Sequence, residues 1–212
     1  MNVVLVTSVL RPVNDSTIFN VESRREQTIN TIKTVREKIP NSYIVMVEGG
    51  KMEELEFKMF SCLVDHLFKT DVSYLRKSPG EASLLYRYLI SDHFKGLDKV
   101  NSVSKLSGRY ILNEKFSWSN FPKDKIIISF VKNSWMNKPL YNTRYYCIPI
   151  FLVQDFIDGL NRYIKSPEFQ TAYPDIEHCF YQHNIINFDK IYTPEIIGVS
   201  GLLTGNGNLV MD

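Results

Sequence analysis

The stretch VVLVTSVL, residues 3–10, decides the fold, because it is a short apolar run rich in β-branched residues and without a helical period. Such a run predicts a strand that is buried on both faces, as in a parallel sheet. Pro12 breaks the pattern at its end. Residues 43–47 form a second run of this kind, and Gly49 and Gly50 behind it predict a sharp turn.

Strands and helices are expected to alternate along the first half of the chain. Helices are predicted at residues 24–39, 52–64, 79–94, 153–164 and 173–184. Further strands are predicted at residues 64–68, 100–106, 125–131 and 145–152, and the Gly-rich residues 198–207 predict a loop. Alternation of this kind is typical of a parallel sheet covered on both faces. We therefore expect an α/β fold: a single Rossmann-like domain with a central, mostly parallel mixed sheet flanked by helices.

Composition restricts the classes of partner. The chain has 212 residues, of which 44% are hydrophobic and 23% charged, as in soluble globular domains. Its 25 Lys and Arg against 23 Asp and Glu give a net charge of +2 without a basic block, so no nucleic-acid partner is expected. Three scattered cysteines predict neither a disulfide framework nor a zinc site, and suggest a reducing, cytoplasmic location. No signal peptide and no apolar run of about 18 residues is found, so no membrane span is expected.

Ligands of open parallel sheets bind beyond the carboxyl ends of the strands. The polar residues that follow the predicted strands are Thr7, Ser8 and Arg11, then Glu48, and then residues 105–110. Each of these residues also has a structural interpretation: its side chain bonds to backbone groups at a strand end, or it forms a turn.

The sequence KLSGRY, residues 105–110, is the most informative of these stretches. Lys105 and Arg109 lie four residues apart around Gly108, where a ligand can approach the backbone closely. A fork-shaped guanidinium and a point-like ammonium together suit a diphosphate. The spacing alone favours a β-turn with two solvated cations over a diphosphate site.

The motif K-x-S-G-R-Y after a strand resembles one found in a group of GT-A-type glycosyltransferases, where it occupies the place of the usual Asp-x-Asp. Other pieces are similar in the same order: VLVTSV at residues 4–9, RREQT at 24–28 followed by IPN at 39–41, VEG at 47–49 and IEH at 176–178. The similarity extends from residue 3 to about residue 180. Enzymes of large algal viruses that decorate capsid protein look like the nearest relatives, which implies a viral protein acting in the host cytoplasm.

This resemblance implies a single GT-A-like domain over residues 1–212, with a nucleotide-binding half at 1–112 and an acceptor-side half at 113–212. It implies transfer of a hexose or deoxyhexose from a UDP-sugar to a glycan or glycoprotein acceptor. The implied nucleotide-sugar contacts are Thr7, Ser8, Arg11, Arg25, Glu48, Lys105, Ser107 and Arg109. Arg24 and Arg25 stand near a predicted helix start, where cations are disfavoured unless they have a partner.

The chain departs from the family pattern because it has no Asp-x-Asp. In enzymes with that pair, a divalent cation neutralises the leaving diphosphate. Here either Lys105 and Arg109 do so, or carboxylates from separate loops, such as Asp98 or Asp175 with Glu177, hold Mn²⁺ or Mg²⁺. The sequence leaves both open, and the four histidines show no metal-ligand spacing.

Asp175 and Glu177 are the candidate catalytic residues, as a base that activates or orients the acceptor hydroxyl. On a helix, residues two apart point about 200° apart, so only one of them is expected to face a given pocket. The plainer alternative is that Asp175, after Pro174, stabilises a helix N-terminus.

Two other functions stay open. Another nucleotide-using transferase would be expected to carry a Gly-rich phosphate loop after the first strand, and residues 7–11 contain no glycine. A non-catalytic carbohydrate- or protein-binding domain would bind a glycan without any donor. The ending LVMD is also compatible with a module of a longer multidomain chain.

Overall fold

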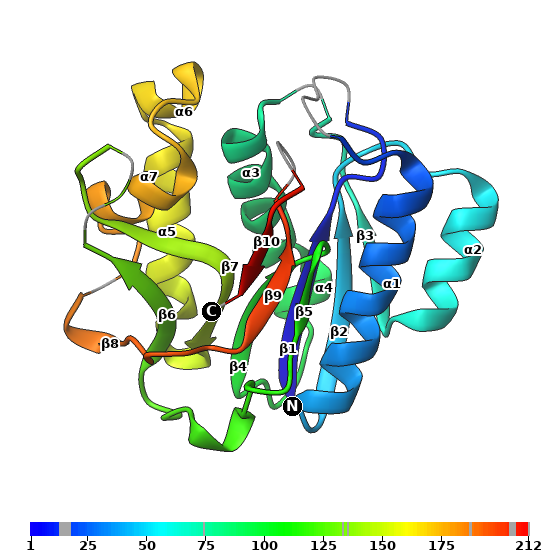
Figure 1. Cartoon of the computed structure of the whole chain (residues 1–212), viewed down its shortest axis with the longest axis horizontal. Coiled ribbons are helices and arrows are strands. Elements are labelled where there is room, and N and C mark those ends of the chain that lie inside the picture. The colour runs from blue at the N-terminus through cyan, green and yellow to red at the C-terminus, as the bar shows by residue number, and fades with distance from the viewer. Residues whose placement is uncertain are drawn as a thin grey trace.

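The central feature of this computed structural model is a seven-stranded sheet in the order β3-β2-β1-β4-β7-β6-β8 (Figure 1). The structure describes residues 1–12, 18–73, 75–132, 134, 136–186, 188–203 and 207–211. The strands of this sheet are β1 (Asn2–Ser8), β2 (Ser42–Glu48), β3 (His66–Lys69), β4 (Ser102–Ser107), β6 (Ile126–Val131), β7 (Leu140–Pro149) and β8 (Ile191–Tyr192).

Strand directions make the sheet mixed but mostly parallel. Strand β1 pairs in parallel with β2 and β4, and β2 pairs in parallel with β3. Strand β7 runs antiparallel to both its neighbours, β4 and β6. The chain leaves β1 toward β2 and β3 and then returns as β4 on the other side of β1. The α/β, Rossmann-like sheet expected from the alternation of runs is thus confirmed, and the strand order reverses between β1 and β4.

Alternating residues of β1 and β2 enter two separate cores. Val3, Leu5 and Val45 pack on one face of the sheet with residues of α3 (Lys77–Leu89), α5 (Val153–Ile164) and α7 (Ile176–Gln182). The short helices α4 (Asp92–Lys95) and α6 (Pro167–Thr171) add to this layer. Val4 and Val6 pack on the opposite face, against α1 (Val21–Lys38) and α2 (Glu54–Leu63).

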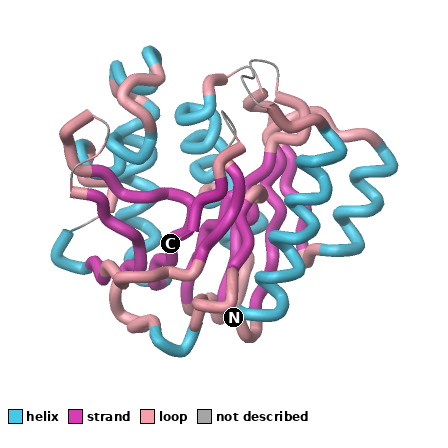
Figure 2. The backbone as a smooth tube through the Cα atoms, viewed as in Figure 1, coloured by secondary structure: helices cyan, strands magenta, loops and turns pink. Residues whose placement is uncertain are grey.

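A second, three-stranded sheet lies on the same face as α1, as Figure 2 shows. Its order is β10-β9-β5, from β10 (Leu209–Met211), β9 (Val199–Leu202) and β5 (Tyr110–Leu112). The expectation of a loop at residues 198–207 was therefore wrong for β9, whereas residues 204–206 lie outside the described residues. Gly201 explains the error: a Cβ there would come within 2.5 Å of the Arg109 carbonyl oxygen, so this glycine permits close strand contact.

Two further boundaries differ from the sequence expectations. The helix expected over residues 79–94 is divided into α3 and α4, because the Ser91 side chain accepts a hydrogen bond from the Phe94 backbone and begins a new helix. Strand β7 begins at Leu140, earlier than expected. Single 3₁₀ turns occur at Trp118–Asn120, Ile150–Leu152 and Phe188–Lys190.

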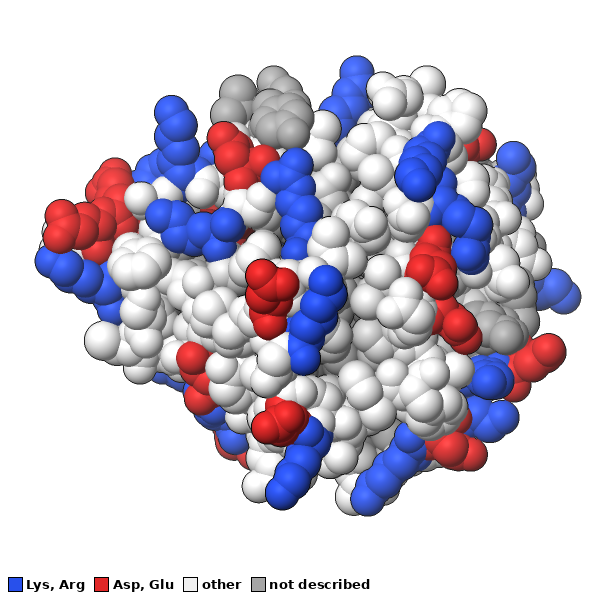
Figure 3. Space-filling model, turned by 180° about the vertical axis from the view of Figure 1, so that it is seen from behind, with Lys and Arg blue, Asp and Glu red and all other residues white. Residues whose placement is uncertain are grey.

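Two further features of the described residues concern apolar helices and surface charge. Among the described residues, no helix is long and apolar enough to cross a membrane. On the face shown in Figure 3, Lys and Arg are interspersed with Asp and Glu and do not form a continuous basic stripe.

Candidate functional site

A cavity of about 450 Å³ opens at the carboxyl ends of β1 and β4, where the strand order reverses. Thr7 and Ser8 contribute the end of β1, and Ser107 and Gly108 contribute the end of β4. One wall is apolar and includes Val9, Pro12, Val72, Leu75 and Leu84. A pocket of this size at this position in an α/β sheet is typical of a small-molecule site.

The charge of this first cavity is strongly one-sided. Its lining contains four cations, Arg24, Arg76, Lys77 and Arg109, and one carboxylate, Glu81. Arg76 is the N-cap of α3, Lys77 is its first residue, and no acidic residue stands in its first turn. Cations at the positive end of a helix are unfavourable by a few tenths of a kcal/mol to about 1 kcal/mol each unless an anion is present. The lining therefore favours an anionic ligand.

A second cavity of about 510 Å³ adjoins the first. Both are lined by the same four residues, Lys77, Glu81, Ser107 and Arg109, which we call the shared rim. The second cavity continues past β7 to α7, and its polar lining includes Ser134, Asn142, Thr143, Arg144, Asp175 and Glu177. A ligand that extends across the shared rim would contact both cavities.

Both predicted catalytic carboxylates line the second cavity, which differs from the expectation that only one would face it. Asp175 is the N-cap of α7, with an extended backbone at φ −64° and ψ 167°, so the helical 200° rule does not apply to the pair. The Glu177 carboxylate accepts a hydrogen bond from Thr143 Oγ1 at 3.2 Å. Asp175 Oδ1 accepts from the His178 backbone N–H at 3.1 Å and contacts His178 Nδ1 at 2.5 Å.

Lys105 lies beneath the shared rim and does not line either cavity. Its side chain is fully buried, and its ammonium donates to Ser107 Oγ and to the Thr143 carbonyl, each at 2.6 Å. It also forms an ion pair with Glu81 Oε1. Burial lowers the pKa of Lys105, while the Glu81 carboxylate opposes that shift. Lys105 therefore fixes two rim residues and is not a surface cation.

Arg109, the other cation of the motif, lines both cavities. Its guanidinium carbon stands 5.8 Å from the centre of the Tyr110 ring, and its Nε has no hydrogen-bond partner among the described residues. Gly108 makes the turn tight enough for this placement. Its N–H donates to the Thr7 carbonyl at 2.8 Å, and a Cβ would lie 3.0 Å from Thr28 Oγ1.

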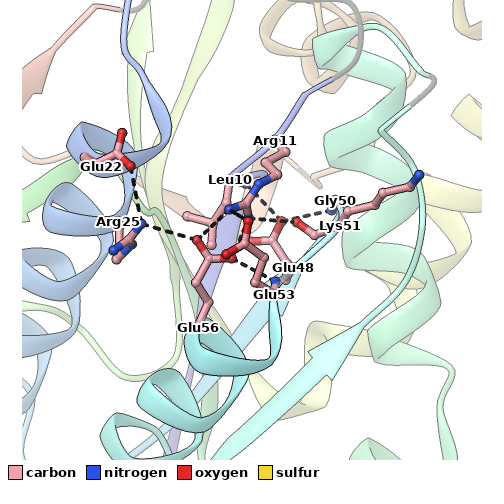
Figure 4. Close-up of polar contacts among 9 residues, drawn as sticks. All are labelled: Leu10, Arg11, Glu22, Arg25, Glu48, Gly50, Lys51, Glu53 and Glu56. Carbon is pink, nitrogen blue, oxygen red and sulfur yellow. Dashed lines mark hydrogen bonds and ion pairs between the residues drawn. The ribbon is translucent and has the colours of Figure 1, made fainter.

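Arg11 and Arg25 are tied into an ion-pair cluster beside the first cavity (Figure 4). Arg11 pairs with Glu53 and Glu56, and Arg25 Nη2 stands 3.5 Å from Glu56 Oε1. Neither arginine lines either cavity. The cluster connects the loop after β1 with the starts of α1 and α2. Arg24, their neighbour, does reach the first cavity, and its Nη1 donates to the Val9 carbonyl at 3.0 Å.

Glu48 is completely buried below the end of β1 and is absent from both linings. Its Oε1 accepts from the backbone N–H groups of Leu10 at 3.0 Å and Gly50 at 2.9 Å (Figure 4). Its side chain is also hydrogen-bonded to Ser8, which does line the first cavity. Glu48 thus holds the turn after β1 from beneath.

The start of α3 supplies the lining residues that the sequence arguments missed. Arg76, Lys77 and Glu81 come from a segment that follows β3, and their nearness to the motif at residues 105–110 depends on the sheet order. A signal existed in the sequence, since two cations directly precede the helix start at Ser78-Pro79. Ser134 and Arg144 were also missed, and no short motif marks either of them.

No metal-binding set is found in the part of the chain that the structure describes, since no three His, Cys, Asp or Glu side chains form a suitable group there. The carboxylates of the cavities have protein partners: Glu81 has Lys105, Asp175 has His178 and Glu177 has Thr143. Asp98 lines neither cavity.

Comparisons with known proteins give distant resemblances to solved structures. No protein-family model and no curated protein matches the chain. A solved structure described as that of "a glycosyltransferase involved in the glycosylation of the major capsid of PBCV-1" is similar, with 12% sequence identity and a TM-score of 0.49. The match covers 91% of this chain and 80% of that one. A likeness this distant carries no argument about activity.

Replacing Lys105 by Met should strongly destabilise the fold, because it leaves the Glu81 carboxylate beside an apolar side chain without its cation. We expect the free energy of unfolding to fall by about 3 kcal/mol. Lys58→Met is the matched control, since Lys58 pairs with Glu54 on an exposed helix surface and should cost less than about 1 kcal/mol. Urea unfolding measures both, and equal losses would contradict the structural role of Lys105.

Glu48→Gln should become relatively more stable as pH rises. Burial raises the pKa of Glu48, although hydrogen bonds from Leu10, Ser8 and Gly50 oppose the shift. The folded chain therefore retains this proton to higher pH than the unfolded chain, and Glu48 costs stability as pH rises from its ordinary pKa through the raised one. Urea unfolding at several pH values should show the variant gaining on the wild type across that window. If the stability of the variant relative to the wild type stayed constant or fell with pH, ionisation of Glu48 would not destabilise the fold.

Proposed function

We propose that the protein is a glycosyltransferase that moves a hexose or deoxyhexose from a UDP-sugar to a glycan or glycoprotein acceptor. The observation that carries the proposal is the pair of adjoining cavities: the first is lined by four cations, the second adds the carboxylates of Asp175 and Glu177, and the two meet at the shared rim. The order of motifs resembling GT-A glycosyltransferases supports the same class. We further propose that the UDP-sugar is bound as a substrate.

The donor is proposed to occupy the first cavity. Its apolar wall suits a nucleobase, and Thr7 and Ser8 offer hydroxyl groups to uracil and ribose at the end of β1. The diphosphate then lies near the start of α3, where Arg76, Lys77 and Arg109 supply cations and the helix supplies its positive end. An anion at this position would turn the unfavourable placement of Arg76 and Lys77 into a favourable one.

Transfer is proposed to take place at the shared rim. When the bond between the sugar and the diphosphate breaks, negative charge accumulates on the leaving oxygen. Lys77 and Arg109 are positioned to stabilise it in place of a divalent cation. The acceptor enters through the second cavity, where Asp175 or Glu177 activates or orients its hydroxyl group. Lys105 and Glu81 keep the rim in position from beneath.

The test is calorimetric titration of the folded protein with UDP and with GDP, each with and without Mn²⁺. We expect binding of UDP in preference to GDP, and equal affinity with and without the metal. Arg109→Ala should weaken UDP binding by about tenfold or more, because a charge-assisted hydrogen bond contributes about 1.5–3 kcal/mol.

Arg162→Ala is the matched control, since Arg162 lies on α5, donates to the Asn184 carbonyl and lines neither cavity. Its UDP affinity should equal that of the wild type. Absence of UDP and GDP binding by the folded wild type would overturn the proposed function and favour a glycan-binding module. A strict requirement for Mn²⁺ would overturn the role given to Lys77 and Arg109.

A further inference from the structure

Three side chains at the second cavity form a continuous hydrogen-bonded series. Ser134 Oγ stands 2.7 Å from His178 Nε2, and His178 Nδ1 stands 2.5 Å from Asp175 Oδ1. Ser134 and Asp175 both line the cavity, whereas His178 is completely buried between them. The proposed function uses one carboxylate here but gives no role to the serine or the histidine.

The contacts of Asp175 determine which nitrogen of His178 carries the proton. Asp175 Oδ1 already accepts from the His178 backbone N–H, and an ionised carboxylate can only accept hydrogen bonds. When the ring is neutral, His178 Nδ1 is therefore its protonated nitrogen, which leaves Nε2 as an acceptor. The Ser134 hydroxyl then donates to Nε2. This is the same tautomer that activates a nucleophile in Ser-His-Asp triads.

The Ser134 oxygen retains capacity for one more hydrogen bond. A hydroxyl has one proton and two lone pairs. The proton is directed to His178, and one lone pair accepts from the Met136 backbone N–H at 3.2 Å. The described residues make no further hydrogen bond to this oxygen, so its second lone pair can accept from a hydroxyl group of a ligand in the cavity. Because His178 is buried, Ser134 connects its Nε2 to a ligand in the cavity.

We propose that Ser134, His178 and Asp175 form a proton relay that deprotonates the acceptor hydroxyl during sugar transfer. The acceptor oxygen forms the new bond to the sugar C1, and the electron pair of the broken C1–O bond goes to the leaving diphosphate. The acceptor proton passes to Ser134 Oγ as the Ser134 proton passes to His178 Nε2. Asp175 stabilises the imidazolium that results. This is a single displacement, so it inverts the sugar carbon. The relay rests on the proposed function for the identity of its substrate.

The same arrangement separates the roles of the two carboxylates. Glu177 receives its hydrogen bond from Thr143 and contributes to the field around buried Lys105. Asp175 is a positioning residue, because it acts on the acceptor through His178 and Ser134. Asp175→Asn is therefore a sharp variant: Asn caps a helix as well as Asp does, but it cannot hold the histidine in the required tautomer.

The relay can be tested without knowing the acceptor, because it should also activate Ser134 toward a fluorophosphonate. In that reaction the serine oxygen forms a bond to phosphorus, fluoride leaves and the serine proton goes to His178. Mass spectrometry should find Ser134 labelled, and Ser107, a second hydroxyl of the same cavity, should remain unlabelled. Asp175→Asn and His178→Gln should each slow the labelling by about a hundredfold, whereas Asp158→Asn, at an exposed carboxylate of α5 that lines neither cavity, should leave it within about twofold.

A second measurement needs no reagent. Imidazole ¹H–¹⁵N spectra of the free protein should show His178 protonated at Nδ1 and unprotonated at Nε2. Asp175→Asn should change this tautomer. Labelling of Ser134 and Ser107 at similar rates, or a wild-type His178 protonated at Nε2, would overturn the relay. UDP affinity, measured on the same variants, should stay unchanged. Absence of UDP binding by the wild type would overturn the proposed function. The labelling result would still decide whether Ser134 is activated.

Discussion

The buried ion pair between Lys105 and Glu81 is the interaction on which the rest of the site depends. It joins the end of β4 to the first turns of α3, and the same ammonium also holds Ser107 and the Thr143 carbonyl of β7. These contacts fix the shared rim between the two cavities. A buried pair of this kind adds little net stability over apolar packing, but losing one partner is costly, so it enforces one arrangement of the three elements. Arg109 and the start of α3 can be placed against a common ligand because this pair lies beneath them.

The two cavities have different chemistry although they share that rim. The first combines an apolar wall with four cations, which suits a nucleotide diphosphate, and the second contains carboxylates, hydroxyls and an amide, which suit a polyhydroxylated acceptor. The whole chain is nearly neutral, with a net charge of +2, so the cations are concentrated at one place by the fold and not by composition. The series from Ser134 to Asp175 then provides a path for the acceptor proton away from the rim.

The sequence predicted the sheet better than the site. Apolar runs such as residues 3–10 and 43–47 are largely buried, and the sequence shows them because the signal lies within each run. The turn in residues 105–110 that places Arg109 is marked in the same local way, by Gly108. It could not predict that Lys105 would point into the core or that Arg11 and Glu48 would be taken up by structural partners, because those outcomes depend on Glu81, Glu56 and Leu10, which are distant in the chain. Gly201 was misread for the same reason, since its close contact with β5 exists only in three dimensions.

The first cavity, at the carboxyl ends of β1 and β4, is proposed to bind a nucleotide diphosphate. The most direct test is to titrate UDP into ¹⁵N-labelled protein and follow the backbone amides. The account predicts saturable shifts shared by Ser8, Lys77, Gly108 and Arg109, with the amides of β8 unchanged. Shifts that avoid these four residues, or that are largest at β8, would contradict it.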